Sequence, residues 1–160
     1  MQIRPLTDDD VPSLVDDLWL PFADEMGGID QYDALSEDTD VRAEAVEYRR
    51  NQLDDEDRQT FVAVDDDAER RLVGYTTVSY SESPPVFARG AVAKVKDLYV
   101  APDARGDGLG TRLLERVHEW GRERGCERAA LSVHVRNEAA QSCYESMGYE
   151  TRYVKMDRPL

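Results

Sequence analysis

Cysteine and lysine are scarce in this sequence. Its 160 residues include two cysteines, Cys126 and Cys143, and three lysines, Lys94, Lys96 and Lys155. The cysteines lack metal-ligand spacing and fall inside expected regular elements, so we interpret them as reduced packing residues, not as a disulfide or a nucleophile.

Long apolar runs are also absent. No segment approaches the roughly 18 to 20 residues of a membrane span, and the N-terminus lacks the apolar core of a signal peptide. We therefore expect a cytoplasmic protein with no membrane partner.

Acidic residues dominate the charge. The chain has 34 acidic and 20 basic residues, a net charge of −14, and the acids are 20 aspartates and 14 glutamates. An Asp-rich, Lys-poor balance is favoured in a salt-loaded cytoplasm, because dense carboxylates keep a protein hydrated there, so we expect an extreme halophile as the source. The acidic clusters at 8–10, 54–57 and 65–67 lack the spacing of a calcium loop and are interpreted as solvated surface, so no metal site is expected. Duplex nucleic acid is an unsuitable partner for this surface.

The charge is divided unevenly along the chain. Residues 1–88 carry 7 basic and 23 acidic groups, net −16, whereas residues 89–160 carry 13 basic and 11 acidic groups, net +2. Any binding of an anion is therefore expected in the second half of the chain.

The apolar periodicity predicts a mixed α/β protein with one domain over residues 1–160. No repeat, linker or hinge divides the chain. The expected order is β-α-α-β-β-β-α-β-α-β. Strands are expected at 2–4, 60–64, 72–80, 91–100, 128–135 and 149–156, and helices at 8–19, 36 or 39 to 53, 109–125 and 138–147. Residues 20–36 are expected to form a loop because they contain Pro21 and the pair Gly27 and Gly28, and a hairpin is expected to turn at 65–70.

A glycine-rich turn joins the expected strand 91–100 to the long helix that follows. Gly106, Gly108 and Gly110 permit backbone conformations closed to other residues and leave the first helical N–H groups free to bind an anion. Arg105 adds charge-assisted hydrogen bonds, so the turn is interpreted as a phosphate cradle. A tight strand-to-helix connection that needs glycine only for its geometry is the alternative. The pattern is neither a dinucleotide fingerprint nor a P-loop, because Thr111 stands at the last glycine position of the former.

Two segments together resemble the GCN5-related N-acetyltransferase (GNAT) superfamily. Residues 105–110, R-G-D-G-L-G, are similar to its pyrophosphate motif R/Q-x-x-G-x-G/A and follow a D-L-Y-V-x-P strand ending. Residues 137–149 resemble its second hallmark, N-x-x-A-x-x-x-Y-x-x-x-G-F/Y. The likeness covers nearly the whole chain. It implies an α/β fold with a mixed, mostly antiparallel sheet and helices on both faces.

The resemblance implies acetyl-CoA as co-substrate and an N-acetyltransferase activity. Pantetheine would lie between strands 91–100 and 128–135. Backbone groups that would pair with it belong to Leu98, Tyr99 and Val100, and those that would hold the pyrophosphate belong to Arg105, Gly106, Asp107, Gly108, Leu109, Gly110 and Thr111. Asn137 is either a helix cap or a residue close to the cofactor.

The implied chemistry is direct attack of a neutral amine on the thioester. Backbone N–H groups near residues 98–100 would stabilise the oxyanion, and Tyr144 would protonate the departing sulfur unless it is only a core aromatic. A base must also take the amine proton. Family members that carry a glutamate on this strand would place it near Lys94 or Lys96, so Asp97 and His134 are the remaining candidates, each with a purely structural alternative.

The acceptor is expected to be a small-molecule amine or a peptide amine. The resemblance places its wall at residues 19–40, in the half with net charge −16, which favours a cationic amine. Residues that could line this wall are Trp19, Phe22, Glu25, Met26 and Tyr32. A non-catalytic acyl-CoA sensor is the alternative function, and a longer acyl donor is a further one. Only about twelve residues follow Gly148, which would either reshape the acceptor pocket or leave a sheet edge open for a homodimer.

Overall fold

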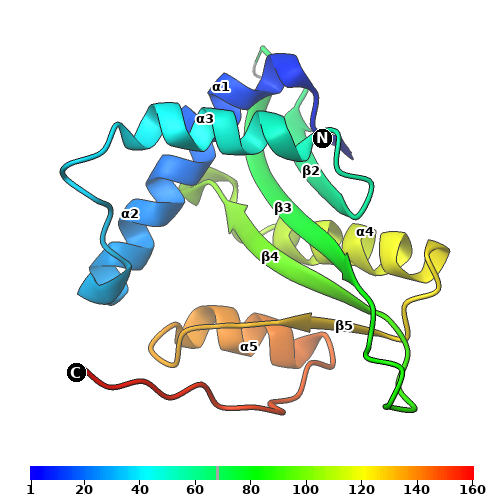
Figure 1. The fold of residues 1–160 in the computed structure, drawn as a ribbon. Helices are drawn as coiled ribbons and strands as arrows, with labels where there is room; N and C mark the ends of the chain where they lie inside the picture. Colours follow the sequence, from blue (N-terminus) through cyan, green and yellow to red (C-terminus); the bar gives the residue numbers. More distant parts are fainter. Residues whose placement is uncertain (68) are drawn as a thin grey trace.

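Five strands form a single mixed sheet in the computed structural model, which describes residues 1–67 and 69–160 (Figure 1). They stand side by side in chain order: β1 (Gln2–Pro5), β2 (Arg58–Asp65), β3 (Arg71–Ser81), β4 (Val92–Val100) and β5 (Arg128–Leu131). The pairs from β1 to β4 are antiparallel, and β4 and β5 are parallel. The expected fold class and the β2–β3 hairpin are confirmed, although residue 68 of the hairpin turn lies outside the described residues.

Helices cover both faces of this sheet (Figure 1). On one face lie α1 (Val11–Ser13), a π-helical segment (Leu14–Trp19), α2 (Leu20–Ile29) and α3 (Val41–Gln52). On the other lies α4 (Leu109–Glu123), and α5 (Glu138–Ser146) follows β5. Single-turn 3₁₀ segments occupy Asp8–Asp10, Gln31–Asp33 and Pro102–Ala104.

Two apolar layers, one on each side of the sheet, hold the domain together. Leu14, Val15 and Leu18 pack with Tyr75 of β3 and Tyr99 of β4. On the opposite face, α4 buries a stripe at helical spacing against the sheet; its members are Leu109, Leu113, Leu114, Val117 and Trp120. Burial of each such side chain contributes roughly 1.5–3 kcal/mol. The two layers hold β4 between them.

The first helical region is longer than expected, because residues 20–29 of the expected loop are helical. The chain accommodates Pro21 through the π-helical segment before it: the N–H of Leu20 bonds to the carbonyl of Val15, an i→i−5 bond. Pro21 therefore stands in the first turn of α2, directly after the π-helical bonds. The sequence shows the proline but not the π-helical bonds that permit it.

Gly27 helps the chain to leave α2. A Cβ at this position would lie 3.3 Å from the Cα of Ala34, so glycine lets the following segment fold back against the helix. Gly27 thus marks the close approach of the segment after α2, and neither Gly27 nor Gly28 breaks the helix. The next helix, α3, begins later than expected: its N-cap is Asp40, whose side chain accepts a hydrogen bond from the N–H of Ala43.

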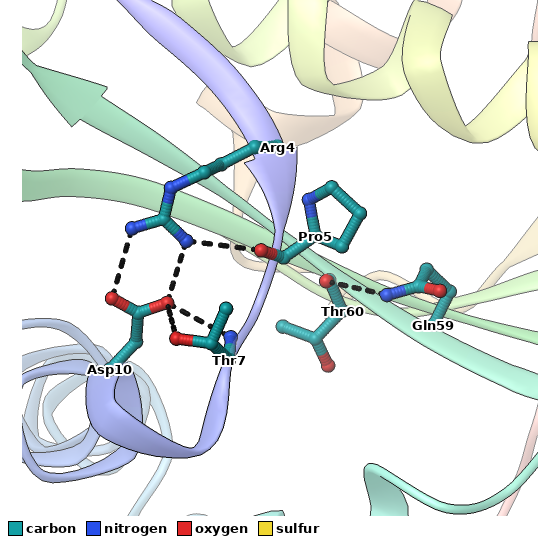
Figure 2. A network of polar contacts seen from close by, with 6 residues as sticks. All are labelled: Arg4, Pro5, Thr7, Asp10, Gln59 and Thr60. Carbon is teal, nitrogen blue, oxygen red and sulfur yellow. Dashed lines mark hydrogen bonds and ion pairs between the residues drawn. The ribbon is translucent and has the colours of Figure 1, made fainter.

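An ion pair fastens the first helical turn to β1 (Figure 2). Arg4 donates to both carboxylate oxygens of Asp10, at 2.6 and 3.0 Å. Asp10 also accepts from the backbone N–H and the hydroxyl of Thr7, at 2.9 and 2.8 Å. These bonds hold the pKa of Asp10 at about 2, and the bond from Arg4 is their largest cause.

The end of the chain differs most from expectation. β5 stops at Leu131, whereas the sequence predicts a strand to residue 135, and residues 149–156 form no strand. Tyr153, Val154 and Met156 are exposed by 79%, 75% and 88%. Their residue types favour a strand, but a lone segment without a paired neighbour is not stabilised as one.

The two helices of the second half match their predictions. Gly108 precedes α4 with φ +78°, and Gly148 follows α5 with φ +91°, both in the left-handed region that favours glycine. Asn137 caps α5, because its Oδ1 accepts from the N–H of Ala140 at 3.2 Å. Within residues 1–67 and 69–160, none of the helices has the length and apolar character needed to span a bilayer.

Candidate functional site

The parallel strands β4 and β5 separate toward their carboxyl ends (Figure 1). Their pairing runs only from Val92 opposite Arg128 to Val95 opposite Leu131, whereas β4 continues to Val100. The backbone of residues 96–100 therefore lacks a β5 partner on that side. The register of β4 against β3 also shifts at this point, so that Lys96 is the extra residue of a bulge. We call this region the β4–β5 splay.

The glycine turn lies directly beyond the splay. It comprises the 3₁₀ segment Pro102–Ala104 and residues 105–108, and Gly106 and Gly108 have φ values of +96° and +78°. The first helical hydrogen bond of α4 runs from the N–H of Arg112 to the carbonyl of Gly108. No described residue accepts a hydrogen bond from the N–H of Leu109, Gly110 or Thr111. These donors stand at the positive end of a 15-residue helix, a suitable site for a phosphate.

Gly110 indicates that the turn fits a ligand. A Cβ on Gly110 would meet nothing closer than the Cγ2 of Val100, at 3.9 Å, and its φ is not positive. Nothing described in the chain therefore requires glycine at this position. A pyrophosphate that approaches the first turn of α4 closely would require it, which fits the cradle better than the purely geometric alternative.

Arg105 is held on the side of the turn that faces α2. Its Nε donates to the carbonyl of Val100 at 2.8 Å, and its Nη2 donates to both oxygens of Glu25, at 3.1 and 3.2 Å. Glu25 also accepts from the hydroxyl of Tyr99 at 3.1 Å. Burial, followed by this bond to Glu25, raises the pKa of Tyr99. Asp107, within the same turn, is exposed.

Tyr144 lies on the opposite face of the sheet from Glu25. It packs with Leu98 of β4 and Leu131 of β5 against the apolar cluster beneath α4, so it contacts the layer that underlies both strands of the splay. Burial is the first cause that raises its pKa above the ordinary value of 10.0. The hydroxyl of Tyr144 thus keeps its proton at neutral pH, as a general acid must.

Asp97 is bound to a buried arginine. Its Oδ2 accepts from Nη2 of Arg49 at 2.7 Å, and Nη1 of Arg49 donates to Thr77 at 2.9 Å. The Arg49 side chain is 3% exposed, and that of Asp97 is 22% exposed. The predicted role of Asp97 as base stays a prediction, and one of its oxygens already has a structural partner. The spacing in the sequence could have indicated that Arg49 is buried, since it falls four residues after Ala45 and therefore on the same, buried face of α3.

His134 is tied to the end of α2. Its Nδ1 accepts the backbone N–H of Arg136 at 3.1 Å, so the neutral ring carries its proton on Nε2, which lies 2.7 Å from Oδ2 of Asp30. This bond from His134 is the largest cause that lowers the pKa of Asp30. Neither ring nitrogen offers a free lone pair to an amine in this arrangement. The predicted role of His134 as base therefore requires one of these contacts to open.

Asp33 adds a third group beside this pair. Ligand atoms of Asp30, Asp33 and His134 lie within 4.8 Å of one another. Because Nδ1 of His134 accepts the N–H of Arg136, the proton of the neutral ring is on Nε2. A metal ion that binds Nε2 would have to displace this proton. The contacts fit a hydrogen-bonded Asp–His pair better than a metal centre, and the expectation of no metal stays a prediction.

The expected acceptor wall is only partly assembled. Phe22 packs against Tyr99 with tilted rings whose centroids are 5.5 Å apart, and Glu25 lies next to the hydroxyl of Tyr99. Trp19 is half-buried against the first core cluster. Tyr32, by contrast, is 83% exposed. α2 thus faces the splay through Phe22 and Glu25, while its end reaches His134.

Comparison with known proteins identifies the family. A model of the acetyltransferase (GNAT) family matches residues 18–149, most of the chain. The chain belongs to the GNAT family. The streptothricin acetyltransferase of Streptomyces lavendulae is 36% identical over 96 residues, which are 60% of this chain and 47% of that protein. The GNAT chain thus spans about half the length of the curated relatives it matches.

Solved structures share the fold along the whole GNAT chain. A tetramutant of the BH1408 protein from Bacillus halodurans superposes with a TM-score of 0.87 at 21% identity, and the match covers 100% of both chains. A predicted acetyltransferase from Clostridium acetobutylicum, solved with acetyl-CoA, has a TM-score of 0.72 at 18% identity and covers 98% of this chain and 95% of that one. At these identities, the likeness establishes the GNAT fold.

Proposed function

We propose that this chain transfers an acetyl group from acetyl-CoA to a primary amine. The observation that carries the proposal is the juxtaposition of the β4–β5 splay with the glycine turn. The splay leaves residues 96–100 without a β5 partner, and the turn presents three free N–H groups at the start of α4. Pantetheine would pair with Leu98, Tyr99 and Val100, and residues 105–111 would hold the pyrophosphate.

The chemistry follows from the groups around the splay. The nitrogen of a neutral amine attacks the thioester carbonyl carbon, a C–N bond forms, the C–S bond breaks, and the sulfur leaves with the electron pair. Backbone N–H groups near Leu98 stabilise the charge on the carbonyl oxygen. The Tyr144 hydroxyl gives its proton to the departing sulfur. The amine proton goes to water or, after its contact opens, to Asp97 or His134.

The acceptor is proposed to be a cationic amine, on a small molecule or a peptide. Glu25 belongs to the half of the chain with net charge −16, which attracts a cation. A related protein is named for acetylation of streptothricin, and this name supports the small-molecule choice.

A non-catalytic acyl-CoA sensor is the second candidate, favoured by one observation: Asp97 and His134 are both engaged in other contacts. A thiol-release assay with acetyl-CoA separates the candidates. We expect release that depends on amines from a panel of polyamines, aminoglycosides and peptides, and that fails with tertiary-amine analogues. Tight acetyl-CoA binding without amine-dependent release at any pH from neutral to about 9, where amines deprotonate, would favour the sensor.

The setting of the protein is also a proposal. We propose a cytoplasmic enzyme from a salt-loaded cell, on the basis of its aspartate-rich composition, and a homodimer that uses the exposed tail after Gly148. Light scattering coupled to gel filtration tests the dimer. A monomeric mass at high protein concentration would refute it.

A further inference from the structure

Glu25 and Arg105 form an ion pair between the expected acceptor wall and the expected donor turn. They are 80 residues apart in sequence, and both oxygens of Glu25 accept from the same Arg105 nitrogen, at 3.1 and 3.2 Å. Tyr99 donates to the same carboxylate and places its ring 5.2 Å from the Arg105 guanidinium carbon. The Glu25 carboxylate of α2 thus pairs with the Arg105 guanidinium of the glycine turn.

The orientation of Arg105 is also fixed from the other side. Its Nε bonds to the carbonyl of Val100 at 2.8 Å, which directs the guanidinium to the end of β4. A donor phosphate at the start of α4 would approach this same guanidinium. Because Glu25 and a phosphate oxygen are both anions that accept from its N–H groups, they compete for it.

The pair is weak enough to exchange. The side chains of Arg105 and Glu25 are 46% and 45% exposed, so solvent screens their attraction. A pyrophosphate carries more charge than a carboxylate and would also be bound by the free N–H groups of α4, so it would win the competition.

We propose that Glu25 occupies the phosphate's place at Arg105 in the donor-free protein, so that acetyl-CoA must displace Glu25 in order to bind. Glu25 therefore lowers donor affinity, and donor binding frees a carboxylate of α2 beside Tyr99. This inference rests on the proposed function, because it assumes that the turn holds the pyrophosphate of an acyl-CoA.

Calorimetric titration of three proteins with acetyl-CoA tests the inference. Glu25→Gln keeps the shape of the side chain and removes its charge, and we expect it to bind acetyl-CoA about two- to fivefold more tightly than the unaltered protein. Asp24→Asn is the matched control, since it removes the same charge from an exposed neighbour on α2. We expect its affinity to stay at the unaltered value.

Two further arms identify the cause of any gain. With acetyl-pantetheine, which lacks phosphate, Glu25→Gln should show no gain, and in an Arg105→Gln background the gain for acetyl-CoA should vanish. A gain of equal size in Asp24→Asn or with acetyl-pantetheine would overturn the competition, as would unchanged acetyl-CoA affinity in folded Glu25→Gln. If the unaltered protein fails to bind acetyl-CoA, the proposed function itself is wrong, and this result is distinct from the others.

Discussion

Arg49 of α3 donates from Nη2 to Oδ2 of Asp97 on β4 at 2.7 Å, beneath the helices that cover the sheet. The guanidinium is 3% exposed and lies over the ring of Tyr75, with its carbon 5.3 Å from the ring centroid. A buried cation of this kind needs its carboxylate partner. The pair therefore anchors the strand at the residue just before the stretch expected to bind pantetheine.

Removal of the Asp97 carboxylate should destabilise the fold. In Asp97→Ala the Arg49 guanidinium stays buried without its charged partner, and we expect the free energy of unfolding to fall by roughly 3 kcal/mol, because Thr77 still accepts one of its hydrogen bonds. Denaturant unfolding measures the loss. Asp16→Ala, which removes the carboxylate of an exposed pair with Arg42, is the control and should barely change the unfolding midpoint. Equal effects of the two substitutions would show that the Arg49–Asp97 pair contributes no more to the free energy of unfolding than an exposed ion pair does.

The Arg4–Asp10 contact makes part of the stability dependent on acid. The pKa of Asp10 in the folded chain is about 2 against an ordinary 3.8. A carboxyl group whose pKa is lower in the folded chain stabilises the fold fully at a pH above its unfolded pKa, and this contribution is lost as the pH falls toward the folded pKa. We therefore expect at most about 2 kcal/mol of the free energy of unfolding to disappear between roughly pH 5 and pH 2. Unfolding of Asp10→Asn, followed over this pH range, should show a shallower loss than the unaltered protein. Parallel curves would contradict the contact.

Tyr144 should be needed for turnover and not for donor binding. We expect Tyr144→Phe to keep its acetyl-CoA affinity and to lose about a hundredfold in kcat, the usual scale of general acid catalysis. Tyr149→Phe is the matched control, because this half-buried tyrosine has its ring centroid 5.9 Å from that of Tyr144 and bonds to His118 instead. An unchanged rate in Tyr144→Phe on a confirmed acceptor would eliminate the hydroxyl as the acid.

Salt should stabilise this protein through its carboxylates. The net charge of −14 produces self-repulsion that salt screens, so we expect the thermal unfolding midpoint to rise from about 0.1 M to about 2 M KCl. The double variant Asp54→Asn/Glu56→Gln neutralises part of one acidic cluster and should reduce this rise. A midpoint that is independent of KCl would argue against the proposed adaptation to salt.

Local sequence signals predicted much of the second half of the chain. The helix at α4 and the positive φ of Gly108 depend on a few neighbouring residues, and each was found where expected. Of the two roles open to Asn137, the structure shows the helix cap. The glycine turn could be predicted for the same reason. Its position at the end of a strand follows from the change of apolar period from two to 3.6.

Features that depend on distant or unusual bonds were missed. The π-helical bond from Leu20 to Val15 carries the helix past Pro21, and no simple periodicity reports it. The missing last strand depends on whether a neighbour is available to pair with, not on local propensity. The contacts of Glu25 with Arg105 and of Asp30 with His134 join residues that are 80 and 104 positions apart. Some of these side chains could therefore be proposed as site residues from the sequence, but the side chains that they contact could not be predicted.

Calorimetric titration with acetyl-CoA at molar KCl tests the central claim most directly. We expect one-to-one binding that Gly108→Trp abolishes, because the new side chain strains a residue at φ +78° and blocks the start of α4. Gly125→Trp is the matched control: it strains a glycine at φ +75° at the opposite end of the same helix and should leave binding intact. Absence of binding by the folded, unaltered protein, or equal binding by Gly108→Trp, would contradict the assignment of this turn as the donor site.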